Sequence, residues 1–355
     1  MWKRIQKFLL KGKRDVVGID IGTGAIKIVE ISWNKDQPVL KSLGIEMLPP
    51  KIIEDGQVFN SKGLTDILIQ LLAKTHISSK HAIIAVGGRG MLARELILPV
   101  MTKEELQEAI KWELEKYIPY PPNSFYFDFS IMGKGDIESE IRVLLVASPH
   151  EFINTITSIV KNVGLIPVAI DVEPLALYRT FTNAENAMII DIGELLSQIT
   201  VFQKGIPVII RNIPLGGQRM TEVIMQVQRI SFYEAEQLKK KHIDLFSFDS
   251  SKECNETKQQ LEVFFAEFLR DVRRTTEYYQ LQNKMVSIDK IYLTGGGSQI
   301  KNLVSYLSKP LDLPVVMHDP LVKLKIPKSF DKSYLQKIAP QLGVAIGLSL
   351  RGGGK

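Results

Sequence analysis

The sequence predicts an α/β protein made of two similar halves, with a small α+β module inserted into the first half. Two segments that read as strand, tight turn and strand, Asp15–Ile31 and Asn186–Phe202, carry the duplication. Superposing Asp20 on Asp191 also superposes three neighbouring pairs: Ile21 on Ile192, Gly22 on Gly193 and Ile28 on Ile199. In each half, strand patterns then alternate with helix patterns, which is typical of an α/β fold.

The duplicated segments begin with strands that are almost continuously apolar, Val16–Ile21 and Met188–Ile192. Strands of this kind are usually buried on both faces of a sheet. The copies are offset by 171 residues, about half of the 355-residue chain. Because solenoid repeats are only about 20–50 residues long, the offset favours two similar domains that face each other.

Residues 91–170 read as an insertion in the first half. Thr102 and Glu105 form a capping-box pattern at the start of a helix. The remaining elements expected in the module are strands at Met91–Leu98, Phe125–Ile131 and Arg142–Ala147 and a helix at Glu151–Asn162. Residues 221–280 of the second half are helix-rich. They contain an apolar stripe expected in the core: Leu261, Phe264, Phe265, Phe268, Leu269 and Val272.

Positive charge is concentrated at the start of the chain. Lys and Arg total 45 and Asp and Glu total 39, and residues 1–14 hold six basic residues and no acid. The rest of the chain is therefore neutral, which argues against nucleic-acid binding by the whole surface. The basic arm also contains four apolar residues: Trp2, Ile5, Phe8 and Leu9. It is either a weak anchor on anionic lipid or a partner, or a frayed, solubilising terminus.

The sequence indicates a cytoplasmic compartment. It has no apolar stretch of the roughly 18 residues that a membrane span needs, and no secretory signal is visible. The single cysteine, Cys254, cannot form an intramolecular disulfide, which fits a reducing environment. Neither His nor Cys shows the spacing of metal ligands.

The first glycine turn, Asp20-Ile-Gly-Thr-Gly24, follows a strand that ends in a carboxylate. Glycine lets the backbone pass close to a ligand, and the amides of such a turn can surround phosphate oxygens. Lys27 could add a charged contact to the phosphate. The Asp20 carboxylate would repel a phosphate unless a cation such as Mg²⁺ lay between them. Alone, this motif could equally be an ordinary hairpin turn. Its copy at Asp191-Ile-Gly193 favours two turns that grip one polyphosphate.

A third glycine turn, Gly295–Gly297, follows another apolar strand. A helix is expected directly after it, with a buried face formed by Ile300, Leu303, Val304 and Leu307. A helix N-terminus behind a glycine turn favours an anion and lets the backbone touch a flat base. The P-loop signature is absent, and Lys27 stands where the Rossmann fingerprint needs its third glycine.

Two acidic hairpins followed by a strand and a glycine triplet resemble the actin-like ATPase superfamily over nearly the whole chain. The resemblance implies an actin-like ATPase fold of duplicated RNase H-like domains with an inserted, SHS2-like α+β subdomain called 1C. It also implies ATP or ADP with Mg²⁺, the metal being held by Asp20 and Asp191. The implied nucleotide-binding residues are Gly22, Thr23, Gly24, Lys27, Gly193, Gly216, Gly217, Glu236, Lys239, Gly295, Gly296 and Gly297.

Two further segments look like the connecting motifs of the superfamily, Asp171–Ala176 and Ala339–Gly347. In the first, Glu173 is the implied general base that positions the attacking water, although an acid at a helix start could also be purely structural. The second has small residues where two domains would hinge. Glu236 and Lys239 lie on a segment similar to the helix beside adenine and ribose, but they could equally be solvated helix charges.

Within the superfamily, the chain resembles the PilM family of type IV pilus assembly proteins most. The matching segments are Trp112–Tyr120, Val143–Pro149, Gly164-Leu165 and Ile170–Glu173. This resemblance implies a cytoplasmic protein, peripheral to the inner membrane, in the assembly platform of a type IV pilus or a related pseudopilus. The cytoplasmic N-terminal segment of PilN would lie in a groove between subdomains 1A and 1C under nucleotide control. Other platform proteins and a second copy of the chain are further candidate partners.

The implied subdomains follow the order in which the chain leaves and re-enters each half. They are the basic arm 1–14, 1A at 15–90, 1C at 91–168, 1A again at 169–186, 2A at 187–220, 2B at 221–274, 2A again at 275–330, and a return to 1A with the tail at 331–355.

The second hairpin departs from the superfamily pattern, which usually has small and hydroxyl residues there. Glu194, Leu195 and Leu196 follow Gly193 in this chain. We therefore expect ATP binding with weak or no hydrolysis. One alternative is an FtsA-like polymerising membrane tether in cell division, which the ending Leu350–Lys355 disfavours because it is no amphipathic helix. Another alternative is a small-molecule kinase of the same superfamily.

Overall fold

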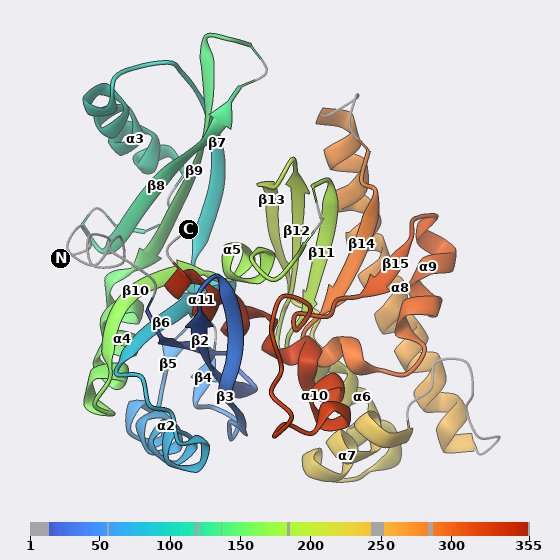
Figure 1. Cartoon of the computed structure of the whole chain (residues 1–355). Helices are drawn as coiled ribbons and strands as arrows, with labels where there is room; N and C mark the ends of the chain where they lie inside the picture. Colours follow the sequence, from blue (N-terminus) through green and yellow to red (C-terminus); the bar gives the residue numbers. More distant parts are fainter. Residues whose placement is uncertain are drawn as a thin grey trace.

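The computed structural model describes residues 14–54, 57–117, 120–121, 123–135, 137–182, 185–242, 252–282 and 287–353. Two five-stranded sheets stand side by side, a smaller sheet rises above the first, and helices cover their faces (Figure 1). The basic arm predicted at residues 1–14 lies outside the described residues except for Arg14.

The first large sheet has the strand order β10-β6-β1-β2-β3. Its strands are β1 (Val16–Ile21), β2 (Ala25–Asn34), β3 (Gln37–Met47), β6 (His81–Val86) and β10 (Ile166–Val172). Helices α2 (Ser61–Thr75) and α4 (His150–Asn162) cover the face that carries Val17 and Ile19. Helix α11 (Gly343–Leu350) packs on the opposite face, where Val16 and Val29 lie. Burial on both faces explains why β1 is continuously apolar.

The second large sheet repeats this topology in the order β13-β12-β11-β14-β15. Its strands are β11 (Ala187–Ile192), β12 (Ser197–Gln203), β13 (Ile206–Ile213), β14 (Lys290–Thr294) and β15 (Val315–Met317). Val16 pairs with Ile31 in the first hairpin, and Ala187 pairs with Phe202 in the second. Both pairs are related by the predicted offset of 171 residues, so the duplication extends to the hydrogen-bond register.

Helices of the second half bury the predicted apolar stripe. They are α6 (Gly217–Gln228), α7 (Phe232–His242), α8 (Lys252–Gln282) and α9 (Leu303–Leu311). Phe264, Phe265 and Phe268 of α8 pack in one core with Met188 and Ile190 of the sheet. The stripe is therefore core, as expected from its helical spacing.

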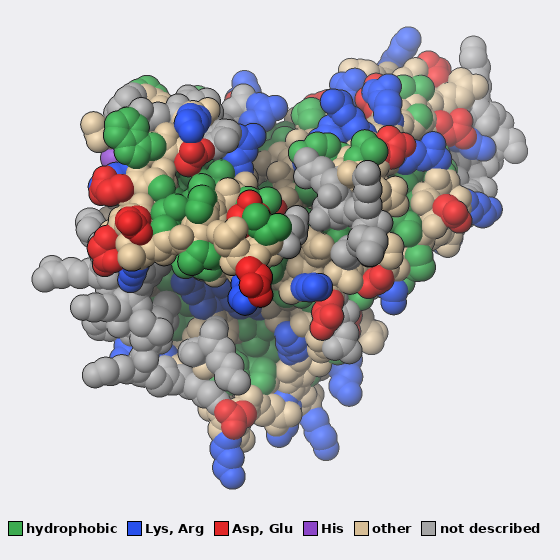
Figure 2. Space-filling view, turned by 90° about the horizontal axis from the view of Figure 1, so that it is seen from above, with side chains coloured by type: hydrophobic (Ala, Val, Ile, Leu, Met, Phe, Trp, Pro, Cys, Tyr) green, Lys and Arg blue, Asp and Glu red, His purple; other side chains and the backbone are tan. Residues whose placement is uncertain are grey.

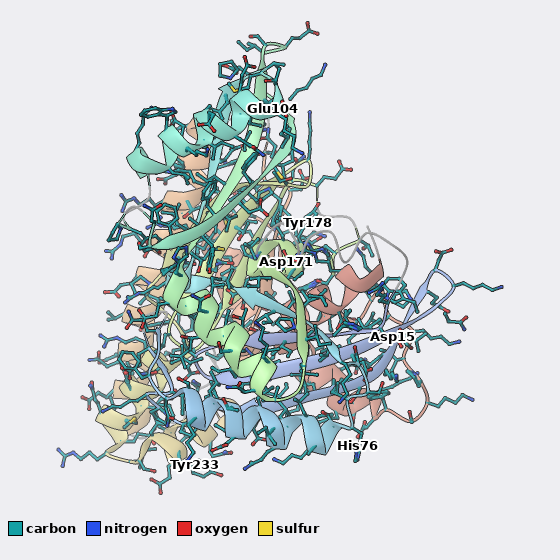
Figure 3. All side chains as sticks on the ribbon, turned by 90° about the vertical axis from the view of Figure 1, so that its left-hand side faces the viewer. Asp15, His76, Glu104, Asp171, Tyr178 and Tyr233 are labelled. Carbon is teal, nitrogen blue, oxygen red and sulfur yellow. The ribbon has the colours of Figure 1, made fainter. Side chains whose placement is uncertain are left out.

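The inserted module has a three-stranded sheet in the order β7-β9-β8, covered by α3. The elements are β7 (Leu92–Pro99), α3 (Lys103–Tyr117), β8 (Phe125–Lys134) and β9 (Glu140–Pro149). The predicted capping box is present: the Thr102 amide donates to Glu105 Oε2 at 2.8 Å, and the Glu105 amide donates to Thr102 Oγ1 at 3.3 Å. Figure 3 places Glu104 of α3 and Tyr233 of α7 at opposite ends of the molecule.

Two short helices cross between the large sheets, α5 (Glu173–Tyr178) and α11. A Cβ on Gly347 of α11 would collide with the carbonyl of Ala176 of α5, so the helices touch backbone to backbone. The Tyr178 ring stacks on Phe202 of β12, with centroids 4.1 Å apart. The predicted small residues therefore lie where the two halves meet.

The structure that follows the glycine triplet differs from the prediction. The triplet continues into a single 3₁₀ turn, Gly296–Gln299, and α9 begins only at Leu303, after Asn302 in a left-handed conformation with φ of 66°. The expectation of an α-helix N-terminus directly behind these glycines is thus wrong. The predicted buried face is right, because Ile300, Leu303 and Leu307 are all buried.

The remaining elements are short. They are β4 (Ile53–Glu54), β5 (Gln57–Val58) and α10 (Lys332–Ile338), with 3₁₀ turns at Gly88–Gly90, Ala339–Leu342 and Arg351–Gly353. No helix in the described ranges is both long enough and apolar enough to cross a membrane. Seen from above, basic, acidic and hydrophobic side chains are interspersed (Figure 2). This mixed surface agrees with the neutral charge of the chain beyond its basic arm.

Candidate functional site

A cavity of about 1020 Å³ lies between the two halves. We call it the central cavity. It is lined by the turns of both hairpins, the start of α5, the start of α6, helix α7 and the glycine triplet after β14. All predicted site residues except Gly216 line it: Asp20, Gly22, Thr23, Gly24, Lys27, Glu173, Asp191, Gly193, Gly217, Glu236, Lys239, Gly295, Gly296 and Gly297. Gly216 is the residue before α6, packed behind the second hairpin turn.

The two hairpins bring one aspartate each to the central cavity. Asp20 pairs across its hairpin with Lys27, and Asp191 pairs with Gln198 at the equivalent register position. Lys27 Nζ lies 3.1 Å from Asp20 Oδ2. The first hairpin therefore presents an ion pair, and the second presents a carboxylate beside an amide.

Glu173, in the first turn of α5, lines the central cavity together with Asp20 and Asp191, and we call this part of the cavity its floor. A Cβ on Gly87, just after β6, would collide with the Glu173 carboxylate, so only glycine leaves room for this side chain. Burial raises the pKa of Glu173 to about 8, and repulsion from Asp20 and Asp191 adds to the effect. The three carboxylates thus share one electrostatic environment.

The floor of the central cavity has an excess of negative charge. Burial raises the pKa of Asp191 to about 6, with Asp20 adding to the rise and Lys27 opposing it. Burial alone would lower the pKa of Lys27, yet the attraction of Asp20, Asp191 and Glu173 raises it. One ammonium therefore faces the carboxylates of Asp20 and Asp191 beside the protonated Glu173, and this arrangement favours the entry of a cation.

The donor set fits magnesium that arrives with a ligand. Among the residues that the structure describes, no group of three or more His, Cys, Asp or Glu side chains is arranged to hold a metal ion. Mg²⁺ commonly keeps several waters and binds one or two carboxylates together with substrate phosphates. Asp20 and Asp191 provide two such carboxylates at the floor of one cavity.

A glycine also makes room for the second aspartate. Gly295 has φ of 84°, a conformation that other residues rarely adopt, and a Cβ there would collide with Asp191 Oδ1. Gly295 follows β14 just as Gly87 follows β6, and these two strands are equivalent in the two sheets. Gly87 was missed from the sequence, although extending the duplication from the hairpins to the third motif would have revealed it.

The halves are joined beside the central cavity by two side-chain amides, those of Gln198 and Asn212, which the sequence analysis did not predict. Gln198 Nε2 donates to Asn212 Oδ1 at 3.1 Å, and Asn212 Nδ2 donates to the Gly88 carbonyl at 3.0 Å. All three residues line the cavity. No local pattern marks them, because the pairing depends on how β13 packs against the loop after β6.

Glu236 and Lys239 are buried, each 7% exposed, so they are not solvated helix charges. Lys239 Nζ donates to the Gly217 carbonyl at 2.9 Å and to Thr221 Oγ1 at 2.7 Å, and it forms an ion pair with Glu236. The Thr221 hydroxyl also donates to Glu236. This network ties α7 to the start of α6 along one wall of the cavity.

Comparison with known proteins agrees with this geometry. A family model described as type IV pilus assembly protein PilM matches residues 18–353. A solved PilM-PilN type IV pilus biogenesis complex is similar, with a TM-score of 0.85 and 26% identity over 96% of this chain and 99% of that chain.

Two more solved structures share the fold. Ethanolamine utilization protein EutJ from Carboxydothermus hydrogenoformans has a TM-score of 0.57 and 17% identity, covering 98% of this chain and 97% of its own. MreB5 of Spiroplasma citri, bound to AMPPNP, has a TM-score of 0.54 and 16% identity, covering 95% of both chains. The actin-like α/β fold expected from the sequence is therefore confirmed.

The comparisons favour neither the cell-division tether nor the small-molecule kinase. The family match spans both large sheets, the inserted module and the central cavity. The chain therefore belongs to the family of type IV pilus assembly proteins PilM.

Proposed function

We propose that the protein binds ATP or ADP with Mg²⁺ in the central cavity and serves as a nucleotide-responsive part of a pilus assembly platform. One observation carries this proposal: Asp20 and Asp191, at equivalent positions of two duplicated hairpins, line the same cavity. Glycine turns border both aspartates, so backbone amides can approach a polyphosphate closely. MreB5, which shares the fold, was solved with AMPPNP.

Each predicted residue has a role in this proposal. Asp20 and Asp191 would hold Mg²⁺, which when bound neutralises phosphate charge. Lys27 would contact phosphate oxygens, and the amides of Thr23 and Gly24 would donate to them. The amides of Gly22 and Gly193 close the hairpin turns, so these two glycines would serve by letting the backbone come close to the phosphates. The glycines at 295–297 would approach the base and ribose, Gly217 would border the phosphates at the start of α6, and Gly216 would support the second hairpin turn from behind. Glu236 and Lys239 hold the wall behind Gly217.

Hydrolysis is expected to be weak or absent. Glu173 is the candidate general base, but burial, the largest cause, raises its pKa to about 8, which makes it a poor acceptor of a proton from water at neutral pH. Leu195 and Leu196 line the central cavity without hydroxyl groups that could contact a phosphate. Nucleotide would then act mainly through binding.

The proposed partner is the cytoplasmic N-terminal segment of PilN, lying in a groove between subdomains 1A and 1C. The similar solved complex contains PilN. The subdomain boundaries, the location beside the inner membrane, the further platform partners and self-association belong to the same proposal. In this chain the module and the second half also touch, since Arg142 of β9 donates to Gln203 Oε1 of β12 at 3.2 Å.

Nucleotide control requires a difference between two states. ATP can shift the conformation only if it binds one arrangement of the halves more tightly than the other. The Asn212–Gly88 and Arg142–Gln203 hydrogen bonds cross between the halves and would change on any relative movement. The groove beside the module would then change with them.

Calorimetry with Mg·ATP and Mg·ADP tests the nucleotide site. Asp20→Asn and Asp191→Asn should each weaken binding by about tenfold or more, equivalent to about 1.4 kcal/mol. Glu138→Gln, at an exposed acid of the module, is the control and should bind like wild type. Wild-type affinity in both aspartate variants would refute the site.

The partner is tested with a peptide of the PilN N-terminal segment. Its affinity should differ between the nucleotide-free protein and the protein saturated with Mg·ATP. At the Mg·ATP concentration that just saturates wild type, the Asp191→Asn variant should show a smaller difference while still binding the peptide. Identical affinities in wild type would remove nucleotide control, even if both ligands bind.

A further inference from the structure

Glu194 stands at the tip of the second hairpin, where the superfamily pattern has a small residue. The Gly193 amide closes the turn by donating to the Leu196 carbonyl at 2.9 Å. Glu194 therefore lies in the middle of a tight turn, directly beside the glycine proposed to contact phosphate. Its side chain lines the central cavity.

The start of α6 holds this turn in place. The Gly217 amide donates to the Gly193 carbonyl at 2.9 Å, and the Gln218 amide donates to the Glu194 carbonyl at 2.8 Å. A Cβ on Gly216 would collide with the same Glu194 carbonyl. The first amides of α6 are thus occupied by the turn, and the backbone of Glu194 cannot move without breaking them.

The Glu194 side chain reaches across to the first hairpin. A Cβ built on Gly24 would lie 2.9 Å from both Cβ and Cγ of Glu194, so the two hairpin turns are in van der Waals contact through this side chain. The space between the two turns is where a gripped polyphosphate would have to lie. Glu194 fills part of that space.

The carboxylate of Glu194 lies over the N-terminus of α6. Its Oε2 is 3.6 Å from the Cβ position of Gly217, and Lys239 Nζ is 3.3 Å from the same point. The carboxylate nevertheless forms no hydrogen bond or ion pair with any described residue, and Lys239 is paired with Glu236 instead. A helix N-terminus and a nearby lysine favour an anion, so this carboxylate takes a position that suits a phosphate.

We propose that the Glu194 carboxylate occupies the polyphosphate position of the central cavity in the absence of nucleotide and must leave it before nucleotide binds. The inference rests on the proposed nucleotide site and adds a residue that sets its affinity. The carboxylate competes with the phosphates for the same region beside Lys239 and the start of α6, and it repels them while it stays there. Removal of its charge therefore tightens the binding of phosphate-bearing ligands and leaves phosphate-free ligands unaffected.

Burial supports this role. It raises the pKa of Glu194, with Lys239 opposing the rise and Glu236 adding to it, so the charged carboxylate is less stable here than in water. The backbone of the turn is fixed, and relief comes through rotation of the side chain. Lys240, which is half-exposed and pairs with Glu236 at 3.2 Å, lies on the same wall and offers a cation to a displaced carboxylate.

Calorimetry on the full chain tests the proposal with three ligands: Mg·ATP, magnesium tripolyphosphate and adenosine. Glu194→Gln and Glu194→Ser should bind the first two about tenfold more tightly than wild type, and adenosine within about twofold of it. Glu222→Gln is the matched control. Glu222 lines the same cavity, but it accepts a hydrogen bond from Gln218 at 2.9 Å and pairs with Arg219.

Each possible result of these titrations either supports or overturns the proposed role of Glu194. Equal or weaker Mg·ATP binding in both Glu194 variants would overturn the proposal, and weaker binding would identify Glu194 as a cation ligand instead. Equal tightening for adenosine would also overturn it, since the variant would then only loosen the cavity. Binding by the variants but not by wild type would support it strongly. Failure of every form to bind nucleotide would reject the nucleotide site itself.

Discussion

Lys27 Nζ lies 3.1 Å from the Asp20 carboxylate, whereas Gln198 occupies the equivalent position opposite Asp191. The two hairpins have the same backbone register, yet only the first carries a cation. The halves are therefore alike in fold and unlike in charge. A bound polyphosphate would meet an ammonium on one side and an amide on the other.

Removal of this ammonium should weaken nucleotide binding. We expect Lys27→Met to bind Mg·ATP about tenfold less tightly, because Asp20 and Asp191 would then face the phosphates without the neighbouring ammonium. Lys74→Met, at an exposed lysine that pairs with Glu46, is the control. Calorimetry at constant ionic strength measures both, and unchanged affinity in Lys27→Met would show that Lys27 has no contact with phosphate.

Glu173 should make the protein less stable in alkaline solution. Its pKa is about 8 in the fold and near 4.5 in the unfolded chain, so between these values the native state binds more protons. The free energy of unfolding then falls as pH rises from about 5 to 8. Glu173→Gln should abolish this part of the loss, which amounts to as much as about 5 kcal/mol by pH 8.5, and should then be more stable than wild type.

Urea denaturation of both proteins at pH 5.5 and pH 8.5 provides the measurement. The two curves should lie closer together at the acidic pH, where wild-type Glu173 also carries its proton. The same variant should retain Mg·ATP affinity within a few-fold, because Glu173 is assigned to water and not to phosphate. A pH-independent difference between wild type and variant would contradict the protonated state.

His318 should destabilise the fold in acid. Burial lowers the pKa of His318 to about 3, and the charge of Lys323 adds to the effect. The ring stacks on Phe181 at 3.7 Å, and its Nε2 lies 2.6 Å from Thr180 Oγ1. The unfolded chain binds a proton near pH 6.5 and the native state does not, so stability falls as pH drops below about 6.5.

The expected slope from His318 is about 1.4 kcal/mol per pH unit between pH 6 and pH 4. His318→Gln should remove this slope. The loss of the stacking on Phe181 should lower the free energy of unfolding by the same amount at every pH. His76→Asn, at the end of α2 where His76 has a left-handed conformation that asparagine tolerates, should retain it. Thermal denaturation from pH 4 to pH 7 distinguishes them, and a parallel pH profile in His318→Gln would contradict a neutral ring.

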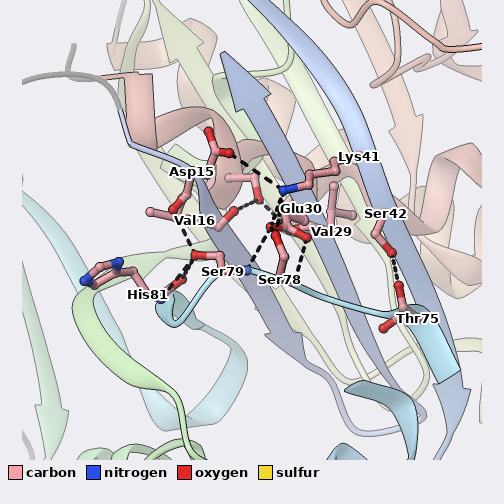
Figure 4. A network of polar contacts seen from close by, with 11 residues as sticks. Asp15, Val16, Val29, Glu30, Lys41, Ser42, Thr75, Ser78, Ser79 and His81 are labelled. Carbon is pink, nitrogen blue, oxygen red and sulfur yellow. Dashed lines mark hydrogen bonds and ion pairs between the residues drawn. The ribbon is translucent and has the colours of Figure 1, made fainter. Parts of the chain in front are cut away.

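Glu30 stabilises the back of the first sheet through a buried polar network (Figure 4). It accepts hydrogen bonds from the Ser78 and Ser79 amides at 3.0 and 2.9 Å and pairs with Lys41 at 3.4 Å. Glu30→Ala should cost about 2–4 kcal/mol, because the buried Ser79 amide and the partly buried Ser78 amide would lose their acceptor. Glu46→Ala, which breaks an exposed pair with Lys74, should cost about 0.5 kcal/mol or less.

Chemical denaturation of the two alanine variants compares these costs. Glu30→Gln should fall between wild type and Glu30→Ala, since its amide oxygen still accepts one of the backbone hydrogen bonds. Equal losses in Glu30→Ala and Glu46→Ala would mean that the network contributes no more than a surface ion pair.

The sequence by itself determined the elements whose cause is local. Apolar runs marked the buried strands, Thr102 and Glu105 marked the start of α3, and the paired turns at Asp20 and Asp191 marked the duplication. Backbone propensity, capping and periodicity act within a few residues, so they can be read directly. The family resemblance followed because it rests on the order of such local motifs.

Only the tertiary structure decided which side chains meet across the halves. It placed the Glu173 carboxylate against Gly87, joined Asn212 to the Gly88 carbonyl and inserted Glu194 between the two turns. It also moved the start of α9 away from the glycine triplet. These contacts join segments up to about 170 residues apart in the chain. Their geometry follows from the packing of two sheets around one cavity, which no local pattern specifies.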